Sequence, residues 1–539
     1  MVPLPVLRTG RIIGMSLLRA SATIGGLTLV SRVLGFLRDM LMARFVGAGF
    51  ASDAFLIAWR LPNLFRALFA EGAFSAAFVP MFNRTVAEAE AKEPGNGLAI
   101  ALRFAEDVLS VLLPFLIVFT VAMMLAAGPI VWAMTGGFPD GGPEKFALAT
   151  QYTRITFPYL MLISLVSLLG GILNSLNRFW VNAAAPILLN ICLIVGLLFF
   201  RGHSEVETAR TQAIAVTVSG ALQLAWLVLA CWQAGVRLRV RLPRLSPEVR
   251  KLLALIGPAA IGAGAVQFNL LISTTLAARF LPQGSVSYLY YADRLNQLPL
   301  GLIGIGVGTA MLPSLSRQLG GGDAKAALDT QNRAIELVLL LTLPATAALM
   351  VSATPLIRAL LQHGVFTPHD TIASARALAA FSLGLPAYVL IKVLTPGFYA
   401  RADTRTPVRI ALVAMLVNLV LNLVLIWPLA HVGLALSTAI SAWVNAVLLY
   451  VTLRRRDHFA VDDRLRRTGI RLIAATLAMA ALLFLLNPWI DPWTGRSLIE
   501  RVAALGAMIA AAVTVYFGLV FALGAYSLAT LKGQLRRRR

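Results

Sequence analysis

Apolar residues gather in fourteen long runs along the chain, separated by shorter polar or charged connections. Most runs reach the roughly 18–20 residues that an apolar helix needs to cross a bilayer. The pattern predicts an all-α polytopic membrane protein with about 14 transmembrane helices. The runs cover residues 16–44, 52–80, 99–132, 149–176, 183–200, 212–233, 252–280, 285–315, 334–352, 372–400, 408–428, 432–453, 469–487 and 500–525.

Two of these runs differ from plain lipid-facing spans. Run 52–80 and run 285–315 both contain charged residues, and each has a proline near its middle, Pro62 and Pro299. Short apolar tracts such as 354–361 leave the number of crossings open by about one pair.

The strongest clusters of basic residues follow even-numbered apolar runs, the sixth, the twelfth and the fourteenth. Clusters lie at 237–251 and 454–471, and the chain ends in four consecutive arginines. The intervening connections hold few basic residues: Lys145, Arg201, Arg210, Arg358 and Arg496. Because cytoplasmic loops are enriched in Lys and Arg, the asymmetry predicts that both termini are cytoplasmic. The plain explanation of the clusters is topology together with contact to anionic membrane lipids, without a specific site.

The composition narrows the class of protein further. Hydrophobic residues make up 58% of the 539 positions and charged residues 13%, with a mean hydropathy of +0.79. These values exclude an ordinary soluble enzyme and a disordered chain. The net charge of +23 follows from the basic loops, so we expect no nucleic-acid partner. Cys192 and Cys231 lie in apolar runs, which argues against a disulfide framework. The first 19 residues show no cleavable signal peptide.

Short matches recur between the two halves of the sequence. Ala43-Arg44-Phe45 recurs at 278–280, Arg60-Leu61 at 294–295, and Val79-Pro80 with Arg84 as Leu312-Pro313 with Arg317. A second match pairs Pro158, Tyr159 and Gly171 with Pro386, Tyr388 and Gly397. Together they predict two pseudo-symmetric six-helix bundles in the same orientation, with a site enclosed between them. The expected parts are a bundle over 1–235, a bundle over 236–456, and an appended helix pair with a basic tail over 457–539.

Charged residues inside the predicted spans are the strongest functional signal. A charge near the bilayer centre is costly, so it usually faces a wet cavity or a partner. Such residues concentrate in the first two runs and in the seventh and eighth, with Lys392 in the tenth. They are Arg32, Arg38, Asp39, Arg44, Asp53, Arg60, Arg66, Glu71, Arg279, Asp293 and Arg294.

Arginines outnumber carboxylates in the first two runs, which predicts a cationic cavity. Arg binds phosphate oxygens through a planar fork, so an anion such as a phosphate or diphosphate is the expected ligand. The alternative is that Arg38/Asp39 and Asp293/Arg294 are internal ion pairs that join helices. Arg44, Arg60 and Arg279 can instead snorkel from helix ends. The five histidines are scattered and no catalytic motif is present, so we expect no metal, no cofactor and no enzyme.

The stretch Ser31-Arg32-Val33-Leu34-Gly35-Phe36-Leu37-Arg38-Asp39 resembles the MurJ (MviN) family of lipid II flippases. Further stretches resemble the same family at 61–66, 70–75, 174–178, 290–295 and 396–399. The resemblance covers nearly the whole chain. It implies the fold of the multidrug/oligosaccharidyl-lipid/polysaccharide exporters, with two extra C-terminal helices.

The resemblance also implies an activity and a set of site residues. A member of this family moves undecaprenyl-diphosphate-linked peptidoglycan precursor across the inner membrane by alternating access. Positions matching Arg32, Arg38, Arg66, Arg294 and Asp53 are important in the family, and Asp39 and Asp293 match acids beside them. The implied helix pair at 469–487 and 500–525 forms a groove for the lipid tail.

Ala67 and Gln297 depart from the family pattern, because relatives can carry an arginine and an acid there. Four other functions remain to be weighed at this point. One is a flippase for another polyprenyl-diphosphate-linked polysaccharide, and another is a cation-coupled multidrug exporter, for which we expect a mainly acidic cavity. A membrane glycosyltransferase or a scaffold is less consistent with short outer loops and intramembrane arginines. The coupling ion is unknown.

Overall fold

The computed structural model describes residues 13–68 and 74–526, and every regular element in these two ranges is helical. The prediction of an all-α fold is confirmed. Nine helical segments of the described residues are long and apolar enough to cross a membrane. The predicted total of 14 crossings stays a prediction.

Contacts divide the described chain into two units. Unit 1 contains the residues up to Phe45 together with Ala54–Gln267, and unit 2 contains Val46–Asp53 together with the residues from Phe268. This division does not test the predicted boundaries after residues 235 and 456, which stay predictions.

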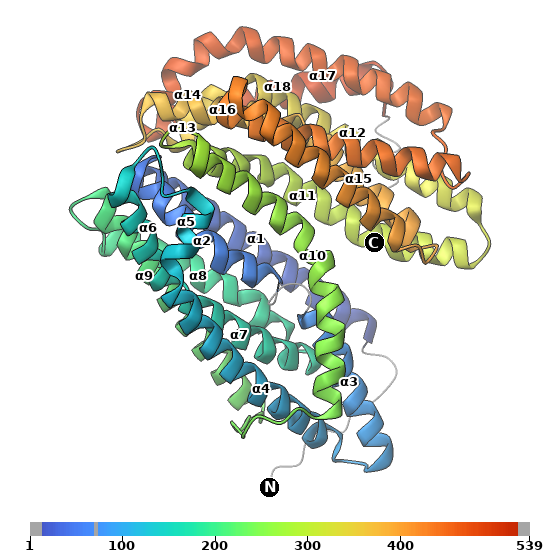
Figure 1. Ribbon diagram of the computed structural model, residues 1–539. Helices are drawn as coiled ribbons and strands as arrows, with labels where there is room; N and C mark the ends of the chain where they lie inside the picture. Colours follow the sequence, from blue (N-terminus) through green and yellow to red (C-terminus); the bar gives the residue numbers. More distant parts are fainter. Residues whose placement is uncertain (1–12, 69–73, 527–539) are drawn as a thin grey trace. The chain divides into compact units, whose positions relative to one another are not determined.

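The elements of unit 1 are labelled in Figure 1. They are α1 (Ile13–Val46), α2 (Phe50–Leu68), α3 (Phe74–Lys92), α4 (Gly97–Leu125), α5 (Ala127–Thr135), α6 (Gly142–Thr156), α7 (Pro158–Ser175), α8 (Phe179–Phe199) and α9 (Glu205–Gln233). Helix α10 (Pro247–Phe280) crosses the division between the units. Helix α7 packs against α3, α4, α8 and α9, so it is the central helix of unit 1.

Unit 2 continues from α10 to the end of the described chain. Its elements are α11 (Ser285–Gly320), α12 (Ala324–Val351), α13 (Ala353–Leu361), α14 (Pro368–Ser382), α15 (Leu385–Tyr399), α16 (Arg405–Arg455), α17 (Asp463–Ile490), the 3-10 helix η2 (Asp491–Gly495) and α18 (Leu498–Ala522). Helix α16 is two helices joined at Ala430, whose φ of 48° and ψ of −131° are not helical, two residues after Pro428. The kink lies between the predicted runs 408–428 and 432–453.

Equivalent spans are interrupted at equivalent places in the two units. Pro158 opens α7 directly after α6, and Pro386 lies in the first turn of α15 directly after α14. A proline lacks the backbone N–H that would continue the preceding helix, so each span becomes two segments. A short helix of nine residues also follows a long helix at the equivalent place in each unit, α5 after α4 and α13 after α12. These matches support the internal repeat.

The C-terminal helix pair packs on unit 2 through an apolar seam. Helix α17 packs along α12 and against α18, and α18 also contacts α13. Leu472, Met479, Met508 and Tyr516 form a buried cluster with Leu340 of α12. The Tyr516 hydroxyl donates to the Leu340 carbonyl at 2.8 Å, so a polar contact adds to the apolar packing.

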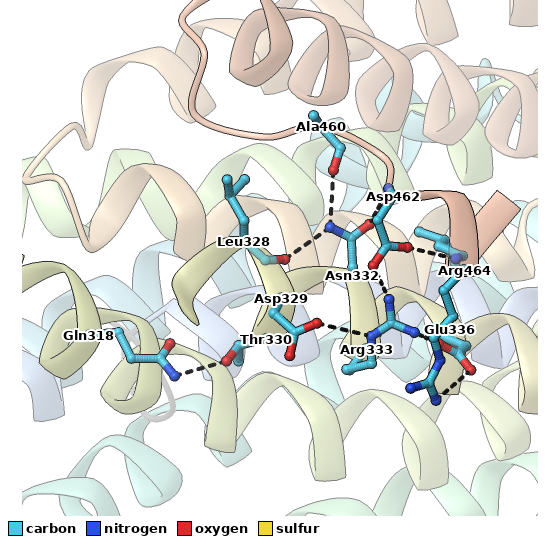
Figure 2. A network of polar contacts seen from close by, with 11 residues as sticks. Gln318, Leu328, Asp329, Thr330, Asn332, Arg333, Glu336, Ala460, Asp462 and Arg464 are labelled. Carbon is cyan, nitrogen blue, oxygen red and sulfur yellow. Dashed lines mark hydrogen bonds and ion pairs between the residues drawn. The ribbon is translucent and has the colours of Figure 1, made fainter. Parts of the chain in front are cut away.

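A polar network fastens the start of α17 to α12 (Figure 2). We call residues 456–462, between α16 and α17, the second connection, to distinguish them from the segment that follows α9 in unit 1. Asn332 donates to the Ala460 carbonyl at 3.0 Å and accepts from the Asp462 backbone N–H at 3.2 Å. Arg333 pairs with Glu336 and with Asp462. The side chain of Asp462 also accepts from the Leu465 backbone N–H and so caps α17. The connection is therefore held from its backbone and its side chains.

Candidate functional site

The predicted cationic residues of unit 1 centre on Arg38, in the second half of α1. Its guanidinium donates from Nε (3.0 Å) and Nη2 (2.7 Å) to Asp39 Oδ1, and from Nη1 (3.0 Å) to Asn190 Oδ1 of α8. The side chains of Arg38 and Asp39 are only 13% and 5% exposed. Asn190 also donates to the Ser31 carbonyl at 2.9 Å. The arginine is thus fixed by an adjacent acid and by a second helix.

The other arginines of unit 1 are placed differently. Arg66 is half-buried near the end of α2, and its Nε donates to Asn63 Oδ1 at 3.0 Å. Arg32 lies nearly two turns before Arg38 on α1 and is exposed. It forms no hydrogen bond or ion pair with the residues that the structure describes. Arg32 can therefore meet an anion without first breaking a contact.

Asp53 has a role that the sequence did not suggest. It is 2% exposed and accepts from the backbone N–H groups of Gly284 (2.8 Å) and Ser287 (3.0 Å), and from the Ser287 hydroxyl (2.6 Å). Gly284 is the N-cap of α11. A carboxylate at this position satisfies unpaired N–H groups and meets the positive end of the helix dipole. Asp53 therefore caps α11 from a distant part of the chain.

The predicted pair of unit 2 lies on α11. Asp293 accepts from Gln297 Nε2 at 2.5 Å, and the Arg294 guanidinium lies 4.9 Å from the centre of the Tyr290 ring. Both charged side chains are half-buried. The neutral Gln297 serves as a donor to the acid. Of the motif at 70–75, residues 70–73 lie outside the described residues.

The two units differ at the position of Arg38. With the offset of 235 that relates Ala43 to Ala278, Arg38 corresponds to Ser273. In unit 2, Asn422 of α16 donates to Ser273 Oγ at 3.2 Å, which parallels the contact of Asn190 with Arg38. The Asn contact is therefore present in both units, whereas the cation at this position belongs to unit 1 alone.

Sequence reasoning missed the residues that hold these charges. Asn190 lies within the apolar run 183–200, and Ser287 near the start of run 285–315. Both are polar residues inside predicted spans, which is the signal by which they could have been found, because polar side chains there commonly join helices. No feature of the sequence indicates which charged residue each of them contacts.

An all-helical membrane protein with two internally similar units, equivalent broken spans and arginines held inside helices belongs to the class of polytopic transporters. The chain belongs to the lipid II flippase MurJ family, whose model matches residues 42–504. A protein of Rhizobium tropici named probable lipid II flippase MurJ is 43% identical over 97% of this chain and 98% of its own length.

Solved structures show the same fold. A lipid II flippase MurJ in an inward closed conformation matches with a TM-score of 0.74 and 24% identity, over 92% of this chain and 97% of its own. An inward-facing multidrug transporter of the MATE family matches with a TM-score of 0.64 and 16% identity, over 79% of this chain and 94% of its own. The expected exporter fold is therefore confirmed.

Proposed function

We propose that the protein moves undecaprenyl-diphosphate-linked peptidoglycan precursor, lipid II, from the cytoplasmic to the periplasmic leaflet of the inner membrane. Family membership over most of the chain carries the proposal. The headgroup crosses by alternating access and no covalent bond changes, so the protein acts as a transporter and not as an enzyme. Both termini lie in the cytoplasm, as the basic connections indicate.

The charged residues suit a diphosphate. Arg32, Arg38 and Arg66 of unit 1 and Arg294 of unit 2 provide planar forks that bind phosphate oxygens and keep their charge in any surroundings. Asp39 and Asp293 orient neighbouring donors and moderate the positive charge. Asp53 contributes by fixing the start of α11, the helix that carries Asp293 and Arg294.

The test is complementation in a host cell from which its own flippase is depleted. Arg38→Ala, Arg66→Ala and Arg294→Ala each abolish growth while membrane levels stay normal, and precursor accumulates on the cytoplasmic leaflet. Arg38→Lys rescues poorly, because a point charge replaces a bidentate fork. Arg409→Ala, an exposed position at the start of α16, is the matched control and retains activity.

Three results would count against the proposal. Full complementation by the Ala variants would remove the arginines from the substrate path. Accumulation of a different polyprenyl diphosphate with normal wall synthesis would indicate a polysaccharide-lipid flippase. Drug resistance that depends on a cation gradient, with no change in precursor, would indicate an exporter of the kind that shares the fold.

A further inference from the structure

An extended basic segment follows α9 in unit 1. We call residues 236–246 the first connection. It contains four arginines, at 237, 239, 241 and 244, and the first three alternate with apolar residues over 236–242. In an extended chain, successive side chains point to opposite sides, so this alternation gives one apolar and one basic side.

A buried glutamate holds the first connection against α4. Glu106 Oε1 accepts from the Arg239 backbone N–H at 3.0 Å, and its Oε2 pairs with Arg241 at 2.7 Å. One turn further on, Ser110 Oγ accepts from the Arg244 backbone N–H at 3.3 Å. The backbone is thereby tied to α4 at two points, and the charge of Arg241 is matched.

Behind the first connection lies an apolar cavity of about 230 Å³. It is lined by leucines of α4 and α7, by Val228 and Trp232 of α9, and by the apolar side of the first connection. Helix α7 contacts both α4 and α9, and the three helices are labelled in Figure 1. Val240 and Trp232, which both line the cavity, are 69% and 60% exposed, so the cavity opens to the surface.

Arg237 and Arg239 alternate in sequence with Val236, Leu238 and Val240, which line this cavity, and we call these two arginines its rim. Arg237 and Arg239 are exposed, and their side chains form no hydrogen bond or ion pair with the residues that the structure describes. Residues 237–251 hold six basic side chains and one acid, Glu248. An apolar cavity beside unengaged guanidinium groups matches a molecule with a hydrocarbon chain and a phosphate, since Arg forks bind phosphate oxygens.

We propose that this cavity binds one anionic phospholipid of the surrounding membrane, with an acyl chain in the cavity and the phosphate at Arg237 and Arg239. If a methylene needs roughly the 30 Å³ that a water molecule occupies in the liquid, the cavity holds about eight of them. That is the end of an acyl chain, not a long polyprenyl tail. Basic pockets between membrane helices are suited to anionic headgroups. The site is separate from the proposed diphosphate residues and does not depend on the transported substrate.

Native mass spectrometry of the full chain in mild detergent tests the proposal, with phosphatidylglycerol and phosphatidylcholine offered at equal concentration. The wild type retains one phosphatidylglycerol with about tenfold preference, because each arginine near a headgroup favours anionic lipid. Val228→Trp fills the cavity and loses the bound lipid. Leu229→Trp is the matched control, since the neighbouring side chain is 51% exposed and does not line the cavity; it retains the lipid.

Substitution of the rim separates headgroup recognition from chain binding. Arg237→Gln with Arg239→Gln removes the preference for phosphatidylglycerol, whereas Arg405→Gln with Arg409→Gln, exposed in unit 2, leaves it unchanged. If Val228→Trp does not fold, as judged by thermal unfolding without added lipid, Leu224→Phe fills the same cavity. Retention by a folded cavity-filling variant, or an unchanged preference in the rim variant, would overturn the site. Displacement of the lipid by undecaprenyl diphosphate would also overturn it and reassign the cavity to the substrate tail.

Discussion

The connections that follow α9 and α16 lie at corresponding places in the two units, and a buried glutamate pairs with an arginine in the first connection and with one just after the second. Glu106 of α4 and Glu336 of α12 are 230 positions apart, as are Arg103 and Arg333, and Pro114 and Pro344. Glu106 pairs with Arg241 of the first connection, and Glu336 pairs with Arg464, just after the second connection. The same acid is thus used in the same way in both units.

The surroundings of the two glutamates differ. Glu106 meets one exposed arginine and one backbone N–H, and the first connection next to it partly covers an open cavity. Glu336 is 1% exposed and also pairs with Arg333, which contacts Asp329 and Asp462 (Figure 2). The pairing of a glutamate with an arginine therefore holds a single connection against α4 in unit 1. In unit 2 the corresponding pairing is part of a larger polar network that fastens α17 to α12.

Removal of the two glutamates gives the largest expected contrast. Glu336→Ala removes one of the carboxylates that pair with the mostly buried Arg333. We therefore expect the free energy of unfolding to fall by about 3 kcal/mol, near the low end for broken buried pairs. Glu106→Ala leaves Arg241 to be solvated by water, and this side chain is already 47% exposed. We therefore expect the free energy of unfolding to fall by only about 1–2 kcal/mol.

Thermal unfolding in one detergent, together with membrane abundance, measures both losses. Asp329→Ala is the control, because the Asp329 side chain is 70% exposed and its pairing contributes little. Equal losses at Glu106 and Glu336 would show that the additional partners of Glu336 add nothing.

The helix pair offers a second contrast, between two faces of α18. Ala512 is buried against the seam with α12 and α17, whereas Ala510 is exposed. Ala512→Trp overpacks the seam and lowers the free energy of unfolding by about 1–3 kcal/mol. Ala510→Trp changes it by no more than about 0.5 kcal/mol. The midpoint of thermal unfolding distinguishes them. A larger loss of stability for Ala510→Trp would mean that other residues of the protein cover this face of α18. A tail-binding groove on this face requires such walls.

That groove, implied by the family resemblance, stays a prediction. Gly506 and Ala510 lie on the exposed side of α18, and a Cβ atom added at Gly506 would have open space around it. The described contacts of α17 and α18 with earlier helices run to α12 and α13. Bulky residues at 506 and 510 therefore test a surface groove without disturbing the packed seam.

Much of the fold follows from local sequence signals. Runs of apolar residues predict the helices, and Pro158, Pro386 and Pro428 mark interruptions that the structure contains, because the effect of proline is local. The run 52–80 is different, since α2 ends at Leu68 and α3 continues from Phe74 to Lys92, beyond the apolar residues. Helix formation there extends into a polar stretch that apolar patterning does not detect.

The candidate site was less accessible from sequence. Arg38 and Asp39 are adjacent, so their pairing could be anticipated. The capping of α11 by Asp53 depends on residues more than 230 positions away, and a single sequence carries no record of that proximity. Glu106 and Glu336 lie near the starts of predicted spans, where a charge is ordinary, so neither stood out.

The smallest expected effect is a difference in pH dependence between the connections, because only the second contains a histidine. Burial lowers the pKa of His458 below its usual value near 6.5, and Arg401 and Arg456 lower it further. Between the lowered pKa and 6.5 the unfolded chain binds more protons than the folded one, so stability falls as the pH decreases through that window and levels off below it.

Thermal unfolding of the wild type from pH 7.5 to pH 5 should therefore show a decrease in the midpoint that His458→Gln makes smaller. His203→Gln, a change outside both connections, should leave the decrease in place. The nearby Asp403, whose pKa is lowered mainly by hydrogen bonds from Thr406 and then by Arg456, stays ionised over this range and contributes no slope. An undiminished slope in His458→Gln would place the pH-sensitive group elsewhere and would remove this distinction between the two connections.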